Sequence, residues 1–116
     1  MLILIDANAA TPVFEQIADQ IAGQIAHGAL EQGSRLPSAR DLAETLEVNV
    51  HTVLHAYQRL RDDGLIELRR GRGAVVTGTA VDETVRTAVH HTVSAARAAG
   101  ISLTSLIALI RSEYLR

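Results

Sequence analysis

The feature that most constrains this chain is a succession of four short segments between residues 38 and 77. Apolar residues recur at helical spacing over 38–46 and again over 50–63, and only three residues separate the two runs. Two segments rich in strand-forming residues follow, 65–68 and 74–77, joined by a five-residue turn that contains two glycines. Two helices with a tight connection, followed by a hairpin, are typical of a helix-turn-helix with a β wing.

The segment before residue 38 supplies a third helix for the core. Thr11 and Pro12 are typical of a helix start, and Gly28 is typical of a helix end. Apolar residues recur at helical spacing between them: Phe14, Ile17, Ala18, Ile21, Ala22 and Ile25. Residues 2–5 form a short strand or an extended arm, and a glycine and a proline bracket a loop over 33–37. The pattern predicts a mostly α fold with a small β-hairpin, a winged helix-turn-helix.

Polar residues mark where the predicted helices begin and end. Ser38 and Asp41 fit a capping box, in which the serine binds a free backbone amide and the acid reaches back. Asn49 is a favoured N-cap for the next helix, and Gly64 suits the position just after its end. The expected helices therefore run from about residue 39 to 46 and from residue 50 to about 63.

Residues 79–116 carry two further amphipathic helices. Asp82 and Glu83 favour a helix start, and Ser102 is a candidate cap for the second helix. Two helices of about thirty residues in all cannot bury their own apolar stripes, so the stripes pack on another subunit or on the first domain. We favour another subunit. The chain then divides into a winged helix-turn-helix over 1–78 and a dimerisation segment over 79–116, with these interface residues: Val85, Val89, Val93, Leu106, Ile107, Ile110 and Tyr114.

Composition and motifs exclude several classes of function. The absence of cysteine excludes disulfides, zinc ribbons, iron–sulfur clusters and cysteine nucleophiles. The longest apolar run, residues 1–5, is far short of the roughly 18 residues of a membrane span, and it lacks the basic flank of a signal peptide. No P-loop, dinucleotide fingerprint or nucleophile–base spacing is present. We therefore expect a cytoplasmic protein that is not an enzyme, has no catalytic residues and needs no cofactor.

The outer face of the helix over 50–63 is unusual for a solvated surface. At about 100° per residue, four residues share the face turned to the core: Val53, Ala56, Tyr57 and Leu60. Three residues point directly away from it: His51, His55 and Gln58. Val50 and Leu54 lie on one flank, and packing against the N-terminal arm is the alternative interpretation for both. Imidazole donates to guanine N7 or phosphate, and apolar side chains contact thymine methyl groups, so this face predicts binding in the major groove of double-stranded DNA.

Arginines add a second indication of DNA binding. All 11 basic residues are arginine, although the net charge is −2. Arg40 occupies the second position of its helix, where a positive charge costs about 0.3–1 kcal/mol unless an anion such as a DNA phosphate binds there. The hairpin turn brings together three arginines and two glycines: Arg69, Arg70, Gly71, Arg72 and Gly73. Glycines let the backbone approach a phosphate closely or enter the minor groove.

Several spaced motifs in residues 11–77 resemble the GntR family of bacterial transcription regulators. The matching stretches are Pro12-Val13-Phe14-Glu15-Gln16-Ile17, Gly33-Ser34-Arg35-Leu36-Pro37-Ser38-Ala39-Arg40-Asp41-Leu42-Ala43, Val48-Asn49-Val50-His51-Thr52-Val53, Ala56-Tyr57, Gly64-Leu65-Ile66 and Arg70-Gly71-Arg72-Gly73. The short tail and the Asn-x-x-Thr-Val-x-x-Ala-Tyr form are similar to the YtrA-like branch. The resemblance implies a winged helix-turn-helix, homodimerisation through the C-terminal helices, and binding to an inverted-repeat operator, usually as a repressor.

The resemblance also assigns roles to individual residues. It places Arg40 on the DNA backbone and near bases, and Arg70-Gly71 at the wing tip. The groove-facing start of the recognition helix consists of Asn49, Val50, His51 and Thr52. With the residues identified above, the predicted DNA-binding set is Arg40, Asn49, Val50, His51, Thr52, Leu54, His55, Gln58, Arg70, Gly71 and Arg72. Many relatives in other branches have arginine at the positions of Val50 and Leu54, so their base preferences do not transfer.

Two other interpretations remain. A winged-helix module that binds protein without reading DNA is the alternative function, and the acidic first helix and the −2 charge favour it mildly. His27, His90 and His91 form a metal site only if the fold brings them together, and neither of the adjacent pair has a carboxylate four residues on. We expect no metal site. The operator, the regulated genes and any small-molecule effector are not specified by the sequence.

Overall fold

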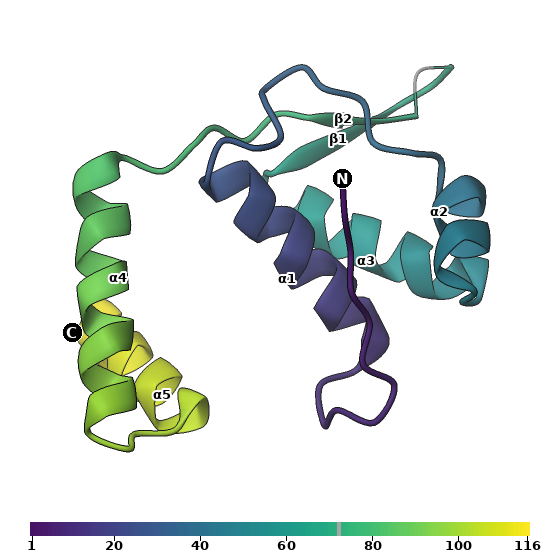
Figure 1. Cartoon of the computed structure of the whole chain (residues 1–116). Helices are drawn as coiled ribbons and strands as arrows, with labels where there is room; N and C mark the ends of the chain where they lie inside the picture. Colours follow the sequence, from purple (N-terminus) through teal and green to yellow (C-terminus); the bar gives the residue numbers. More distant parts are fainter. Residues whose placement is uncertain (72) are drawn as a thin grey trace. The chain divides into compact units, whose positions relative to one another are not determined.

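The computed structural model describes residues 1–71 and 73–116, which form two compact units, Met1–Val81 and Asp82–Arg116. In the first unit the described elements are the helices α1 (Val13–Ala26), α2 (Ala39–Leu46) and α3 (Val50–Asp62), then the strands β1 (Ile66–Arg69) and β2 (Gly73–Val76). The second unit holds α4 (Glu83–Ala98) and α5 (Leu103–Tyr114) (Figure 1). This element order confirms the predicted fold class, a winged helix-turn-helix followed by two C-terminal helices.

Side-chain caps start four of the five described helices. Ser38 Oγ accepts a hydrogen bond from the Asp41 amide at 3.1 Å, and Asn49 Oδ1 accepts one from the His51 amide at 2.8 Å. Asp82 and Ser102 cap α4 and α5 in the same way. The exception is α1, which begins one residue later than its sequence signal and has Pro12 at the cap position without a side-chain bond.

The core of the first unit lies where α1, α3 and the hairpin meet. α3 packs against both α1 and α2, and β1 packs beside α3. The largest side chains in this core are almost completely buried: Ile17, Ile21, Ile25, Val53, Leu60, Ile66 and Val76. The predicted inner face of α3 is therefore confirmed, since all four of its residues are buried.

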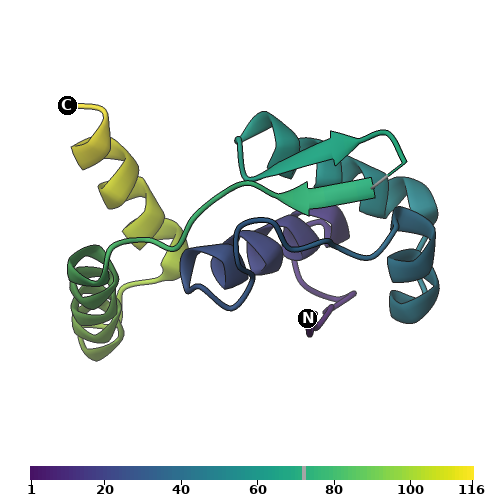
Figure 2. The same cartoon turned by 90° about the horizontal axis from the view of Figure 1, so that it is seen from above.

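The hairpin has a third backbone neighbour. β1 pairs antiparallel with β2, with Ile66 opposite Val76 and Arg69 opposite Gly73. On the other edge of β2, the 33–36 segment bonds to Ala74 and Val76 over 2.8–2.9 Å. Figure 2 shows this segment running beside β2 toward α2. The predicted loop is thus a short ladder that connects the start of α2 to the wing.

The N-terminal residues form an extended arm alongside α1 (Figure 1). Three glutamines spaced four apart on α1 bind the arm backbone: Gln16, Gln20 and Gln24. Gln20 accepts from the Leu4 amide at 2.9 Å and donates to the Leu4 carbonyl at 2.6 Å. Four residues of a helix span about 6.0 Å, which is close to the roughly 6.6–6.8 Å spanned by two residues of an extended chain. Every second residue of the arm therefore lies beside a glutamine and forms a hydrogen bond with it. The arm therefore bonds to α1 through side-chain amides.

The boundary between the two units falls after Val81, three residues beyond the expected division at residue 78. The Val81 amide donates to the Ala26 carbonyl at 2.8 Å, which holds residues 79–81 on the first unit. No helix among the described residues has the length and apolarity that a bilayer crossing requires.

Tyr57 connects α3 to the loop before α2. Its side chain is 2% exposed, and its hydroxyl donates to the Pro37 carbonyl at 2.6 Å. Burial disfavours the charged phenolate and raises the pKa of Tyr57 well above its ordinary value of 10.0. The folded protein therefore keeps this proton at a pH where the unfolded chain loses it.

We expect alkaline pH to destabilise the fold through Tyr57. The pKa of Tyr57 is higher in the folded protein than in the unfolded chain, so the stability linked to its protonated form is fully present below pH 10. Above pH 10 the free energy of unfolding decreases, by up to about 1.4 kcal/mol per pH unit. Tyr57→Phe should remove this alkaline loss and cost about 1 kcal/mol at neutral pH through the missing hydrogen bond. Urea unfolding between pH 7 and 11 measures both effects. The control is Tyr114→Phe, at a tyrosine that is 87% exposed; an equal alkaline loss in wild type and Tyr57→Phe would contradict the assignment.

Candidate nucleic-acid interface

The N-terminal half of α3 presents the predicted groove-facing residues to solvent. His51 and Gln58 are exposed, and Thr52 is half-buried. The Asn49 carboxamide oxygen caps α3, so its amide nitrogen is the part that remains for a further contact. The helix start therefore combines a fixed backbone geometry with exposed polar side chains.

Val50 and Leu54 lie in different surroundings, although the sequence places them on one flank. Val50 is half-buried and packs against the core cluster, so it is less available to DNA than expected. Leu54 is 38% exposed and lines a slot between α3 and the wing. No residue of the N-terminal arm lines that slot, so packing beneath the arm does not explain Leu54.

His55 makes a contact that helical spacing did not indicate. Its ring stacks on Phe14 of α1, with ring centroids 3.7 Å apart and the planes 11° from parallel. Beside this stack, Arg59 approaches Glu15 at 3.8 Å and Asp63 at 3.7 Å. His55 is exposed, as helical spacing predicts, but the first turn of α1 covers one face of its ring.

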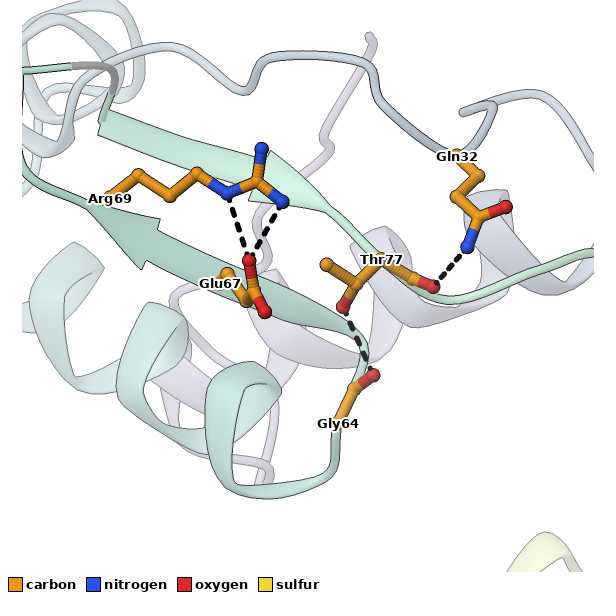
Figure 3. A network of polar contacts seen from close by, with 5 residues as sticks. All are labelled: Gln32, Gly64, Glu67, Arg69 and Thr77. Atoms are coloured by element: carbon orange, nitrogen blue, oxygen red, sulfur yellow. Dashed lines mark hydrogen bonds and ion pairs between the residues drawn. The ribbon is translucent and has the colours of Figure 1, made fainter.

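The arginines of the site fall into two groups. Arg69 is held by Glu67, whose Oε2 lies 2.8 Å from both Nε and Nη2 of the guanidinium (Figure 3). Arg40, exposed in the first turn of α2, and Arg70, exposed at the wing, form no ion pair with any residue in the described ranges 1–71 and 73–116. Among the described residues of this site, Arg40 and Arg70 thus carry positive charge that no ion pair neutralises.

The wing is fixed at its base by two side chains that the sequence analysis did not single out. Gln32 Nε2 donates to the Thr77 carbonyl at 3.1 Å, and Thr77 Oγ1 donates to the Gly64 carbonyl at 3.2 Å (Figure 3). At the tip, Gly71 has a φ of +78°, a conformation that favours glycine. The predicted contact by Arg72 lies outside the described residues.

A slot of about 450 Å³ separates α3 from the wing. Leu54 stands on its helix side, Leu68 and Arg70 on its wing side, and Ser38 and Ala39 close the end formed by α2. The walls of this slot are largely apolar. The described residues thus bring together the start of α2, the outer face of α3 and the wing.

His90 and His91 are adjacent residues of α4. The rings of His90 and His91 lie 6.1 Å apart and are tilted by 55°. Within the part of the chain that the structure describes, no three histidine, cysteine or acidic side chains are grouped to hold a metal ion.

Comparisons with known proteins agree on one family. Residues 14–76 match the model for bacterial regulatory proteins of the gntR family. The HTH-type transcriptional repressor YtrA of Bacillus subtilis is 39% identical over 79 residues, which are 68% of this chain and 61% of that protein. The HTH-type transcriptional regulator Rv1152 of Mycobacterium tuberculosis is 34% identical over 99 residues, 84% of this chain and 82% of the relative.

A solved structure extends the similarity to almost the whole chain. YtrA from Sulfolobus acidocaldarius, a GntR-family transcription factor, has a TM-score of 0.62 at 38% identity. The match covers 97% of this chain and 96% of that one. The chain thus spans about three fifths of the Bacillus relative but nearly all of this structural neighbour.

We expect the Phe14–His55 stack to stabilise the fold. His55→Ala should lower the free energy of unfolding by about 1 kcal/mol, because a stacked aromatic pair contributes about 0.5–1.5 kcal/mol. His51→Ala is the matched control, since it makes the same change one turn earlier on the same helix without breaking a ring stack. Urea denaturation measures both. Equal effects of the two substitutions would show that the stack adds nothing.

Proposed function

Because the chain belongs to the GntR family of bacterial regulatory proteins, DNA-binding transcription regulators rather than enzymes, we propose that it is a sequence-specific repressor that binds an inverted-repeat operator as a homodimer. The observation that carries the proposal is the arrangement of two unpaired arginines, Arg40 and Arg70, around the exposed start of α3. Phosphate contacts from such residues fix a protein on the duplex, while the helix between them reads base edges.

In this proposal, α3 and the wing contact different grooves of the DNA. The start of α3 enters the major groove, with His51 and Gln58 as the principal base readers and Thr52 and the Asn49 amide nitrogen beside them. The wing turn at Gly71 enters the neighbouring minor groove, where Arg72 adds charge. Val50 and His55 contribute less than expected from sequence, since one is half-buried and the other is stacked on Phe14. The protein acts in the compartment that holds the chromosome, which we propose to be the cytoplasm.

Dimerisation is proposed through the exposed apolar surface of α4 and α5. Val85, Val89 and Ile110 are 50%, 53% and 50% exposed, and Ile107 is 42% exposed. Tyr114 borders an apolar hollow of about 430 Å³ on α5. Contiguous exposed apolar surface of this kind is typical of an interface. A two-fold dimer through this surface would present two recognition helices, which matches an inverted repeat.

Two residues of the predicted interface, Leu106 and Val93, are less exposed than the others. Among residues 82–116, all described, the buried side chains are Ala96 and Leu106. Leu106 is only 9% exposed, so it belongs to the internal packing of the two helices, and it is removed from the proposed interface. Val93 is half-buried and lies at the margin. Helical spacing identified the apolar stripe, but it could not show which residues pack within one chain and which remain for the second subunit.

We expect Arg40→Ala and Arg70→Ala to weaken DNA binding on every sequence while the protein stays folded and dimeric. Each lost phosphate contact should reduce the slope of log affinity against log salt by about 0.9 on B-DNA. Arg61→Ala is the control, because it makes the same charge change in the last turn of α3. Selection of duplexes from a random pool, followed by titration of the selected duplex between 50 and 200 mM salt, measures these effects. Weak, sequence-independent binding by the wild type would instead favour the protein-interaction module.

We expect the double substitution Val89→Glu and Ile110→Glu to give folded monomers. Two buried, unpaired carboxylates at a two-fold interface cost far more than the same charges in solvent. Sedimentation velocity measures the oligomeric state, and circular dichroism checks that the helices remain. The control is Thr87→Glu, at an exposed polar position of α4. Dimers that persist in the double variant would place the interface elsewhere.

A further inference from the structure

Two exposed leucines face the slot between α3 and the wing. Leu54 on α3 is 38% exposed and Leu68 on β1 is 43% exposed, although both belong to the well-packed first unit. Tyr57 and Ala74 complete the apolar lining. The Tyr57 hydroxyl donates to the Pro37 carbonyl, so its hydrogen is not available to a polar ligand in the slot. The lining of the slot between these side chains is therefore mostly apolar.

We propose that this slot receives one sugar–phosphate strand of the DNA duplex, with deoxyribose carbons against Leu54 and Leu68. The proposal rests on the DNA-binding function proposed above. Adjacent major and minor grooves of a duplex are separated by a single sugar–phosphate strand. If α3 occupies the major groove and the wing the neighbouring minor groove, that strand must pass between them. The slot is the space between these two elements.

The charges around the slot match this occupant. Arg70 lines the wing side and has no ion-pair partner among the described residues, so it is available to a phosphate. Arg69 also lines the slot, but its guanidinium is paired with Glu67 (Figure 3). Ser38 and Ala39 at the start of α2 also line the slot, and the N-terminus of a helix favours a nearby anion. An apolar floor with a cationic rim fits an apolar sugar between anionic phosphates.

This assignment gives Leu54 a role other than base reading. A leucine that contacts a thymine methyl group discriminates between sequences, whereas one that contacts deoxyribose stabilises every sequence equally. A leucine also releases no counterion, so its loss should leave the salt dependence unchanged. Leu54 and Leu68 then act as a pair that seats the backbone and sets the depth of α3 in the groove.

The test compares wild type with Leu54→Ala, Leu68→Ala and the double variant on the selected duplex and on a scrambled duplex. We expect each substitution to reduce affinity about tenfold on both duplexes, the scale set by two or three methyl-sized groups losing contact. The salt slope should stay at the wild-type value, in contrast to Arg70→Ala. Leu54→Met and Leu68→Met should restore most of the affinity, because methionine keeps the apolar volume. The control is Leu4→Ala, at an arm leucine that is 71% exposed.

Each other outcome has a definite meaning. A loss confined to the selected duplex would make Leu54 a base reader and overturn the proposal. Unchanged affinity in the double variant, with circular dichroism showing a folded protein, would also overturn it and leave the slot to another kind of ligand. A wild-type protein that binds no duplex would instead overturn the DNA-binding function itself, and the slot assignment with it.

Discussion

The buried face of α3 sets the position of the other elements in residues 1–81. Its four inner residues are buried, and the helix contacts α1, α2 and β1. Once this face is buried, the opposite face of the helix must be exposed, because successive residues turn by about 100°. The orientation of the recognition surface is thus a consequence of apolar packing on the opposite face of the helix.

The wing is attached to this core by buried strand residues, among them Ile66 and Val76, and is braced by backbone hydrogen bonds. The 33–36 segment bonds to β2 on one side, and β1 bonds to it on the other. Since the same segment leads directly into α2, the wing and the start of α2 are held by one ladder (Figure 2). The wing side of the slot proposed to seat a DNA strand and its end at the start of α2 are therefore fixed relative to each other. Preorganisation of this kind reduces the entropy lost on binding.

Charge is distributed so that a chain with a net charge of −2 still presents a local cationic site. Arg59 and Arg61 approach carboxylates on the protein, and Glu67 holds Arg69. Exposed ion pairs such as these stabilise the fold little, at most about 1 kcal/mol each. Their larger effect is to neutralise these three arginines, whereas Arg40 and Arg70 form no ion pair within residues 1–71 and 73–116. Apolar surface from α4 and α5 is segregated in the same way on the second unit.

Local sequence determined the elements and the caps. Ser38, Asn49 and Asp82 bind amides two or three residues away, so their roles follow from neighbouring residues alone. The inner face of α3 could also be predicted from the sequence, because helical spacing depends only on the helix itself. Motif spacing over residues 11–77 also identified the family, which the match over residues 14–76 confirms.

Only the tertiary structure decided the contacts between residues distant in sequence. Phe14 in α1 and His55 in α3 are separated by one helix, α2, and two connections, so no spacing rule for α3 could indicate their stack. The glutamines of α1 bind the arm across 10 to 22 residues, and Leu106 is buried because two helices fold together. Periodicity gives the face of a helix on which a side chain lies, whereas packing decides what covers that face. A single chain's sequence therefore identified the surface of α3 that faces outward, and the fold decided which of its side chains remain free.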